Sequence, residues 1–240
     1  MSFQFNQQPP HMQISENELQ GTFAAAMARV YLWMTLGLFI TVGAALVTLY
    51  TPLFNIVFSS MLIPIGLFVV EIILVITISR AINRLSPTTA LALFFLYAAI
   101  NGLTLSAIFV IYSLGTIFLA FGTCAILFGV MSVVGFTTKQ DLTSWGRLLF
   151  FGLIGLIIAS IVNMFLGNGI IDLLLSYLGV AIFLGLTAYD TQMIKRMTAG
   201  GLAQGDTLVV SRVGVIGALR LYLDFINLFL YLLRIFGRRR

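Results

Sequence analysis

The sequence predicts an all-α polytopic membrane protein with seven transmembrane helices, and three observations support this prediction. Hydrophobic residues make up 60% of the 240-residue chain and charged residues 9%, compared with roughly 25% charged residues in soluble domains. The charges are clustered, so that residues 30–70 and 85–138 contain none. As single straight helices these two runs would be about 60 and 80 Å long, whereas a bilayer core is about 30 Å thick. Each run therefore folds back inside or across the membrane.

The same pattern excludes several other classes of protein. The apolar runs are continuous, whereas the strands of an outer-membrane barrel alternate polar and apolar residues. The only cysteine, Cys124, lies inside an apolar run, and the only histidine, His11, lies in the polar N-terminal region. Zinc protease motifs and Ser-His or Cys-His dyads each require a histidine, and the apolar runs contain none. We therefore predict that the protein is not an enzyme. The basic residues lie in short loops, which is typical of membrane orientation and not of nucleic-acid binding.

Breaks in the apolar pattern define the first three spans. The first is predicted at about 30–50, where a Thr-Pro pair ends it. The second is predicted at about 57–79, and Pro64 is expected to kink it. Pro87 precedes the third span, which is predicted at about 89–112.

Four further segments follow after short turns or loops. They are predicted at about 116–136, 148–166, 170–189 and 208–236. A Ser-Leu-Gly turn precedes the first of these, and a Gly-Asn-Gly turn separates the second from the third. Arg220 and Asp224 interrupt the last segment, which therefore either crosses the membrane or re-enters it. Its length is sufficient for a tilted crossing, which favours a full span.

The distribution of basic residues predicts the orientation. All eight that flank the first six spans fall on one side: Arg29, Arg80, Arg84, Lys139, Arg147, Lys195, Arg196 and Arg212. By the positive-inside rule that side is cytoplasmic. We therefore expect residues 1–28 to form a polar cytoplasmic tail, residues 29–237 the membrane domain, and residues 238–240 a basic C-terminal end.

Three acidic residues within the apolar segments are candidates for a functional site. Asp190 ends the sixth predicted span, Asp224 lies near the middle of the seventh, and Glu71 lies inside the second. Ionisable groups in hydrocarbon are rare and usually functional. Two carboxylates on neighbouring antiparallel helices tend to share one proton, so Asp190 and Asp224 predict a proton sensor or a cation site. Calcium prefers oxygen ligands, and the amide of Asn227 is a candidate for a further ligand.

Purely structural roles for the same residues remain open. Arg220 lies four residues before Asp224, at the spacing of an intrahelical ion pair, and Lys195 lies near Asp190. Glu71 is able to hydrogen-bond a neighbouring helix or to pair with Arg220. Four further polar residues of the spans are expected to form interhelical hydrogen bonds and not to bind ligands: Asn101, Thr104, Ser106 and Asn163.

Two motifs resemble those of a known family. They are TAYDTQ at 187–192 and, towards the C-terminus, LYLDFINLF at 221–229 followed by LLRIFG at 232–237. In sequence, order and position they closely resemble the transmembrane Bax inhibitor motif family, and the apolar layout is similar over residues 29–237. The short polar tail and compact loops look most like a bacterial inner-membrane member.

The resemblance implies a fold and a function. The last helix is expected to be central, between two layers of three helices. The implied function is a pH-sensitive calcium leak in which Asp190 and Asp224 form the sensor and gate, with calcium as the transported ion and no cofactor. The family's acidic residue in the second helix corresponds to Glu71. A basic latch residue near the end of that helix is implied too, for which Arg80 and Arg84 are the candidates.

The main hypothesis is therefore a pH-gated calcium leak or transporter in the lipid bilayer. One alternative is an intramembrane aspartyl protease, which also needs two aspartates on adjacent helices. Asp224 follows Leu-Tyr-Leu, however, where such proteases carry a Gly-x-Gly-Asp loop. A second alternative is a non-transporting regulator that binds another membrane protein, such as a membrane protease, through residues 1–28 or a helix face.

Overall fold

The computed structural model describes residues 16–82 and 84–237, with the backbone alone described for residues 16–19. Every regular element in these ranges is a helix. The elements are α1 (Glu16–Tyr50), α2 (Leu53–Val57), α3 (Leu62–Ala81), α4 (Pro87–Leu105), α5 (Ile108–Ile111), α6 (Leu114–Thr137), α7 (Thr143–Leu166), α8 (Gly169–Ala203) and α9 (Thr207–Phe236). Because α1 begins at Glu16, the second half of the predicted polar tail is helical, while residues 1–15 and 238–240 lie outside the described part of the chain.

Seven helical segments within the described residues are long and apolar enough to cross a membrane. They are α1, α3, α4 together with α5, α6, α7, α8 and α9. The predicted fold class, an all-α membrane protein with seven transmembrane helices, is therefore confirmed. The last helix is continuous over 30 residues, or about 45 Å at 1.5 Å per residue, which exceeds the hydrocarbon thickness of a bilayer.

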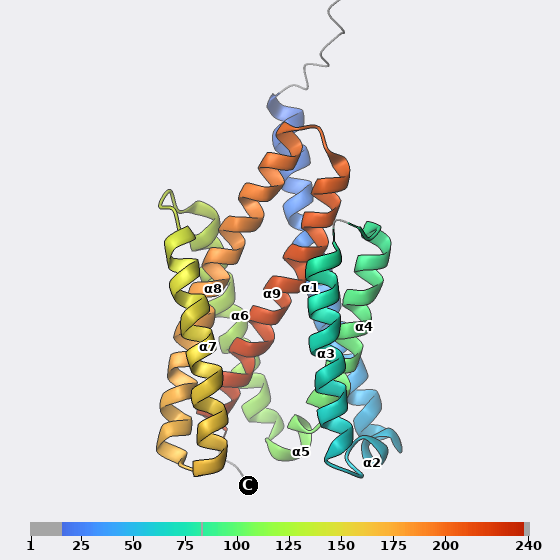
Figure 1. Ribbon diagram of the computed structural model, residues 1–240, viewed down its shortest axis with the longest axis vertical. Coiled ribbons are helices and arrows are strands. Elements are labelled where there is room, and N and C mark those ends of the chain that lie inside the picture. The colour runs from blue at the N-terminus through green and yellow to red at the C-terminus, as the bar shows by residue number, and fades with distance from the viewer. Residues whose placement is uncertain (1–15, 83, 238–240) are drawn as a thin grey trace, which may run out of the picture.

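Helix α9 is the most buried of the seven. Within its most apolar window 72% of the residues are buried, compared with 11–33% in the others. It packs against α1 and α4 on one side and against α6 and α8 on the other (Figure 1). Helix α3 packs on α4, and α7 packs on α8. The outward faces of these helices are covered by exposed Leu, Ile, Val and Phe side chains, as expected for contact with lipid.

Local sequence signals account for several helix ends. Ser86 accepts a hydrogen bond from the backbone N–H of Thr89, and Pro87 occupies the first position of α4. Asp206 caps α9 by accepting bonds from Leu208 N (3.0 Å) and Val209 N (2.9 Å). Gly205, with φ of +67°, forms the tight turn that joins α8 to α9. These two helices therefore run antiparallel, and their turn projects beyond the ends of α3, α4 and α7 (Figure 1).

Two local predictions are wrong. Pro64 lies in the first turn of α3, where its missing N–H breaks no helical hydrogen bond, so it does not kink a span interior. The sixth span does not end at Asp190, because α8 continues to Ala203. Asp190 is consequently surrounded by helix on both sides and not placed at a helix terminus.

Candidate functional site

The two aspartates of the predicted site lie on the antiparallel pair α8 and α9. Asp190 on α8 is 6% exposed and Asp224 on α9 is 4% exposed, so both carboxylates lie in the protein interior. The Asp224 side chain is close enough to Asp190 for the two groups to interact electrostatically. The pairing of α8 with α9 therefore brings together two acidic residues that are 34 positions apart in the sequence.

Arg220 binds Asp190 and not Asp224. Its Nη1 donates to Asp190 Oδ1 at 3.1 Å, across the contact between α8 and α9. The intrahelical Arg220–Asp224 pair expected from the four-residue spacing does not form. The Arg220 side chain is 44% exposed whereas that of Asp190 is 8% exposed, so the guanidinium connects a buried carboxylate with the surface. Lys195 is directed elsewhere and donates to the carbonyl of Phe136 at 2.7 Å.

The Asp224 carboxylate is incompletely bonded. Its Oδ2 atom is buried and has no hydrogen-bond partner among the residues that the structure describes. Buried polar atoms in proteins are almost always hydrogen-bonded, and an unbonded ionised carboxylate is costly in a low-dielectric interior. A proton or a bound cation would satisfy this oxygen. The site thus has one carboxylate held by an arginine and a second that is available to a small ion.

Glu71 belongs to a separate buried network and does not contact Arg220. Its Oε2 accepts a bond from Asn101 Nδ2 at 3.2 Å, and its Oε1 accepts one from Thr104 Oγ1 at 3.0 Å. Both donors are on α4, whereas Glu71 is on α3. The predicted interhelical roles of Asn101 and Thr104 are thus realised, and their common partner is the acidic residue that the sequence singled out.

The network continues to the central helix through Tyr222. The Tyr222 hydroxyl donates to Asn101 Oδ1 at 3.0 Å and lies 2.6 Å from Thr41 Oγ1 on α1. Four helices, α1, α3, α4 and α9, therefore meet in one chain of hydrogen bonds from Glu71 to Thr41. Tyr222 precedes Asp224 by two positions, so the network contacts α9 next to the aspartate pair. Sequence reasoning gave Tyr222 no role, although it lies inside the LYLDFINLF motif.

Apart from Arg220, none of the other predicted site residues forms a hydrogen bond or ion pair with either aspartate in the described part of the chain. The Asn227 Nδ2 atom donates to the carbonyl of Leu223 in its own helix at 2.8 Å. Arg80 lies in the last turn of α3 and Arg84 beyond it; both are exposed, and neither forms an ion pair with any described residue. The described part of the chain holds no group of three or more acidic, histidine or cysteine side chains arranged to bind a metal.

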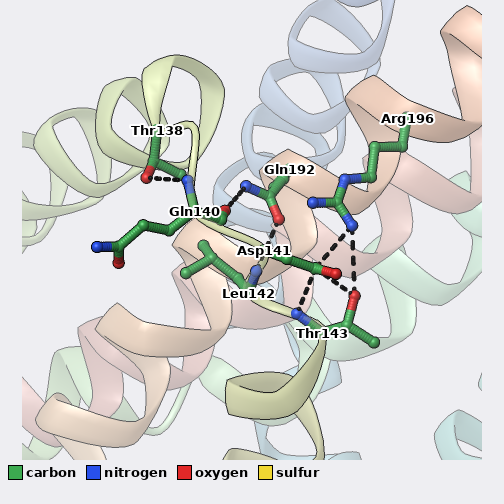
Figure 2. Close-up of polar contacts among 7 residues, drawn as sticks. All are labelled: Thr138, Gln140, Asp141, Leu142, Thr143, Gln192 and Arg196. Carbon is green, nitrogen blue, oxygen red and sulfur yellow. Dashed lines mark hydrogen bonds and ion pairs between the residues drawn. The ribbon is translucent and has the colours of Figure 1, made fainter.

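Gln192 and Arg196 of α8 bind residues 140–142 of the loop between α6 and α7, and we call these contacts the loop clamp (Figure 2). Gln192 is buried and holds the loop between α6 and α7 at two points: its Oε1 accepts from Leu142 N at 2.9 Å, and its Nε2 donates to Gln140 O at 2.7 Å. One turn further along α8, Arg196 Nη1 donates to Asp141 Oδ1 at 2.7 Å. The TAYDTQ motif thus supplies both a candidate functional aspartate and the glutamine that fixes the neighbouring loop.

The ion pair of this loop clamp is expected to be independent of pH near neutrality. Hydrogen bonds from the Thr143 hydroxyl and backbone, followed by the bond from Arg196, lower the pKa of the Asp141 carboxyl to about 2. Because folding lowers this pKa, the ionised Asp141 stabilises the folded loop fully above pH 3.8, the ordinary pKa value. This contribution is lost as the pH falls from 3.8 towards 2. Hydrogen-exchange protection of residues 138–143, corrected for intrinsic rates, should therefore be equal at about pH 5 and about pH 8.

The control for this prediction is Arg196→Gln. The variant should lower protection of the loop by the same factor at both pH values, because Asp141 stays ionised at both. The assignment would be contradicted if protection of the loop in the wild type is lower at about pH 5 than at about pH 8, while protection in Arg196→Gln is the same at both.

Comparison with known proteins identifies the family. Residues 24–240 match the family described as "Inhibitor of apoptosis-promoting Bax1". The chain belongs to the Bax inhibitor family. It is 45% identical over 215 residues to the inner membrane protein YbhL of Escherichia coli K12, covering 89% of this chain and 92% of YbhL. A protein of Borreliella burgdorferi is 47% identical with the same coverage, and one of Deinococcus radiodurans is 42% identical over 213 residues, covering 89% of this chain and 90% of the relative.

Membership of the Bax inhibitor family confirms the resemblance inferred from the two motifs. In this member the motif at 187–192 supplies Asp190 and Gln192, and the motif at 221–229 supplies Tyr222 and Asp224. The structure assigns each of these four side chains to a buried position. The motif residues therefore form the interior contacts of α8 and α9 and do not face the lipid.

Proposed function

We propose that the protein is a multi-pass protein of the bacterial inner membrane that acts as a pH-sensitive calcium leak gated by Asp190 and Asp224. The observation that carries the proposal is the buried, unbonded Oδ2 atom of Asp224 beside the Asp190–Arg220 ion pair. Inner-membrane location is supported by the seven apolar helices and by the name of the relative YbhL. The positive-inside rule supports a cytoplasmic position for the end that carries the basic loops.

Charge balance explains how such a site responds to protons. When Asp224 is protonated, Arg220 and ionised Asp190 cancel, and the buried cluster is neutral. Loss of that proton leaves one uncompensated negative charge in a low-dielectric interior, which is costly. A cation that approaches the pair compensates this charge, or Arg220 moves from Asp190 towards Asp224. Either response changes the contact between α8 and α9. A contact that has two arrangements is what a gate requires.

The ligand set is suited to conduction of calcium. Calcium takes six to eight oxygen ligands in tight protein sites, and two carboxylates supply only a part of that number. Asn227 donates its Nδ2 to its own helix, which leaves its Oδ1 atom available as a further oxygen ligand. A permeating ion must bind strongly enough to enter and weakly enough to leave. Two aspartates completed by water molecules meet this requirement better than a closed binding loop.

The hydrogen-bond network of Glu71 supports a coupling of the gate to the rest of the bundle. Tyr222 and Asp224 lie on different sides of α9, so a rotation or shift of this helix at Asp224 also displaces the Tyr222 hydroxyl from Asn101 and Thr41. Packed cores have discrete arrangements and do not deform continuously. The proposal therefore treats α9 as the two-state element and the Glu71 network as a contact that stabilises one of its states.

Calcium flux into liposomes tests the proposal directly. Wild-type protein should give a flux that differs between about pH 5 and about pH 8, and Asp224→Asn should reduce this difference by about tenfold, a usual size for the coupling between two sites. Asp190→Asn should alter the flux at both pH values, because it releases Arg220. Asp206→Asn is the matched control, since asparagine is as good a helix cap as aspartate and the residue lies in the α8–α9 turn.

Two outcomes would reject the proposal. If both site variants retain the wild-type flux and its pH dependence, the aspartate pair is not the gate. If the wild-type protein carries no calcium, the non-transporting role that binds another membrane protein is favoured instead. The protease alternative is disfavoured by the Asp190–Arg220 bond, because aspartyl proteases use both carboxylates on a water molecule. Cleavage of a reporter helix by the purified protein would revive it.

A further inference from the structure

A polar cavity lies at the end of the bundle opposite the loop clamp. It measures about 520 Å³ and lies where α7 ends, α8 begins and α9 ends. Two charged side chains line it, Asp172 from α8 and Arg234 from α9. The proposed gate uses neither residue. The cavity is therefore independent of the aspartate pair, and its charges need a separate explanation.

An unpartnered amide also lines this cavity. Asn163 on α7 is 7% exposed, and its Oδ1 atom is buried without a hydrogen-bond partner among the described residues. Its Nδ2 atom forms no hydrogen bond with them either, and a half-turn of the amide exchanges the two atoms. The amide can thus offer a donor or an acceptor to the cavity. Buried amides are normally satisfied, so this one indicates a polar ligand.

The two charges are only loosely paired with each other. Arg234 Nη1 and Asp172 Oδ1 are 3.7 Å apart, beyond ordinary hydrogen-bond length, and the two side chains are 45% and 41% exposed. The Arg234 guanidinium also lies over the ring of Tyr231, 5.5 Å from its centroid, which holds it at the cavity. Each group therefore keeps most of its capacity to bind an opposite charge from outside.

The chemistry of the cavity favours a ligand that carries both charges. A guanidinium recognises a phosphate through paired N–H donors, and a carboxylate recognises an ammonium group. A simple anion would be opposed by Asp172, and a metal cation would be opposed by Arg234. A neutral zwitterion that has a phosphate and a primary ammonium matches both side chains, and the Asn163 amide completes the bonding of either group.

The position of the cavity indicates that this zwitterion is part of a lipid. Ile161 and Met164 form its apolar wall and are 52% and 72% exposed on the outer surface of α7. This wall lies at the end of the apolar segment Thr143–Leu166, and the end of a helix that crosses the bilayer is expected at the level of the lipid headgroups. We infer that the cavity bounded by Asn163, Asp172 and Arg234 is a binding site for the headgroup of a phosphatidylethanolamine-type lipid.

Lipid retention by the purified protein tests the inference. Detergent-solubilised protein is incubated with phosphatidylethanolamine, phosphatidylcholine or phosphatidylglycerol of identical acyl chains, and bound lipid is counted by native mass spectrometry. Phosphatidylethanolamine should bind about tenfold more tightly than phosphatidylcholine, a difference of about 1.4 kcal/mol. The reason is that the quaternary ammonium of phosphatidylcholine has no N–H donor for Asp172. This comparison needs only the wild-type protein and so does not depend on the folding of a variant.

Variants locate the site. Arg234→Gln and Asp172→Asn should each abolish the preference for phosphatidylethanolamine over phosphatidylcholine. Arg147→Gln is the matched control, because Arg147 is an exposed arginine at the other end of α7, and it should keep the wild-type preference. The inference is overturned if the wild type binds the three lipids equally, if the Arg234 and Asp172 variants keep the preference, or if soluble phosphoethanolamine or calcium alone displaces the lipid at equal concentration.

Discussion

Replacement of Gly135 by alanine is expected to destabilise the protein strongly and to disturb the aspartate pair. A Cβ atom at Gly135 on α6 would overlap the backbone of Ala188 on α8, with the carbonyl oxygen of Ala188 as its nearest neighbour. Backbone atoms cannot turn away as a flexible side chain does, so α6 and α8 must separate. Overpacking of this kind costs about 1–3 kcal/mol. Because Ala188 is two residues before Asp190, the separation should also displace the Asp190–Arg220 ion pair.

The same substitution elsewhere on α6 provides the control. Gly122→Ala introduces its Cβ where nothing lies within 4 Å, and an alanine in a helix interior is up to about 1 kcal/mol more favourable than glycine. Thermal unfolding in detergent should therefore give a lower Tm for Gly135→Ala and an unchanged or higher Tm for Gly122→Ala. Equal Tm values for the two variants would show that the helices α6 and α8 do not approach closely at this position.

Replacement of Tyr222 by phenylalanine is expected to have the second largest effect. The change keeps the ring but removes the hydroxyl that binds Asn101 Oδ1 and contacts Thr41. A buried acceptor that loses its donor costs about 1–3 kcal/mol. Tyr222 is fully buried, so water is not expected to replace the hydroxyl without rearrangement of α9. A lower free energy of unfolding and a loosened contact between α9 and α4 should result.

Tyr97 offers a matched control for this prediction. Its ring packs edge-on against that of Tyr222, with centroids 5.6 Å apart, yet its hydroxyl forms no hydrogen bond with any described residue. Tyr97→Phe should therefore change the stability little. A double-mutant cycle between Tyr222→Phe and Glu71→Gln measures the connection through Asn101, and the expected coupling is about 0.5 kcal/mol or more. Additive effects of the two changes would mean that the network does not act as a unit.

The two substitutions affect contacts on different sides of α9. Gly135 acts on the side where α8 and α6 hold the aspartate pair, and Tyr222 acts on the side where α1 and α4 hold Glu71 and its partners. If α9 is the moving element of a gate, both variants should alter the pH dependence of calcium flux as well as stability. A change in stability alone would assign both contacts to folding.

The succession of apolar runs was sufficient to predict the number and order of the membrane-spanning helices. Each run ends where Pro, Gly or a basic residue appears, and these signals act within a few residues of the boundary. The prediction failed where the signal was ambiguous. Pro64 appeared to lie inside a span but occupies the first turn of α3, and α8 continues past Asp190 because its later residues are polar yet remain helical.

The sequence by itself also singled out Asp190, Asp224 and Glu71 as candidates, because ionisable residues in apolar segments are rare. It did not determine their partners. In a soluble helix an apolar stripe marks the buried face, but a membrane span is apolar on every side. The hydrophobic pattern therefore does not predict how each span is rotated about its axis relative to its neighbours. The four-residue spacing suggested that Arg220 pairs with Asp224, whereas the rotation of α8 and α9 directs it to Asp190.

The tertiary structure decided what surrounds each acidic residue. Packing of α3, α4, α1 and α9 joined Glu71 to Tyr222, and the close approach of α6 to α8 at Gly135 fixed the surroundings of Asp190. Both depend on distances between helices that are remote in the sequence. Local composition therefore determines that this protein crosses the membrane and which residues are costly there. Only the packing of the helices determines which of those residues find hydrogen-bond partners and which do not.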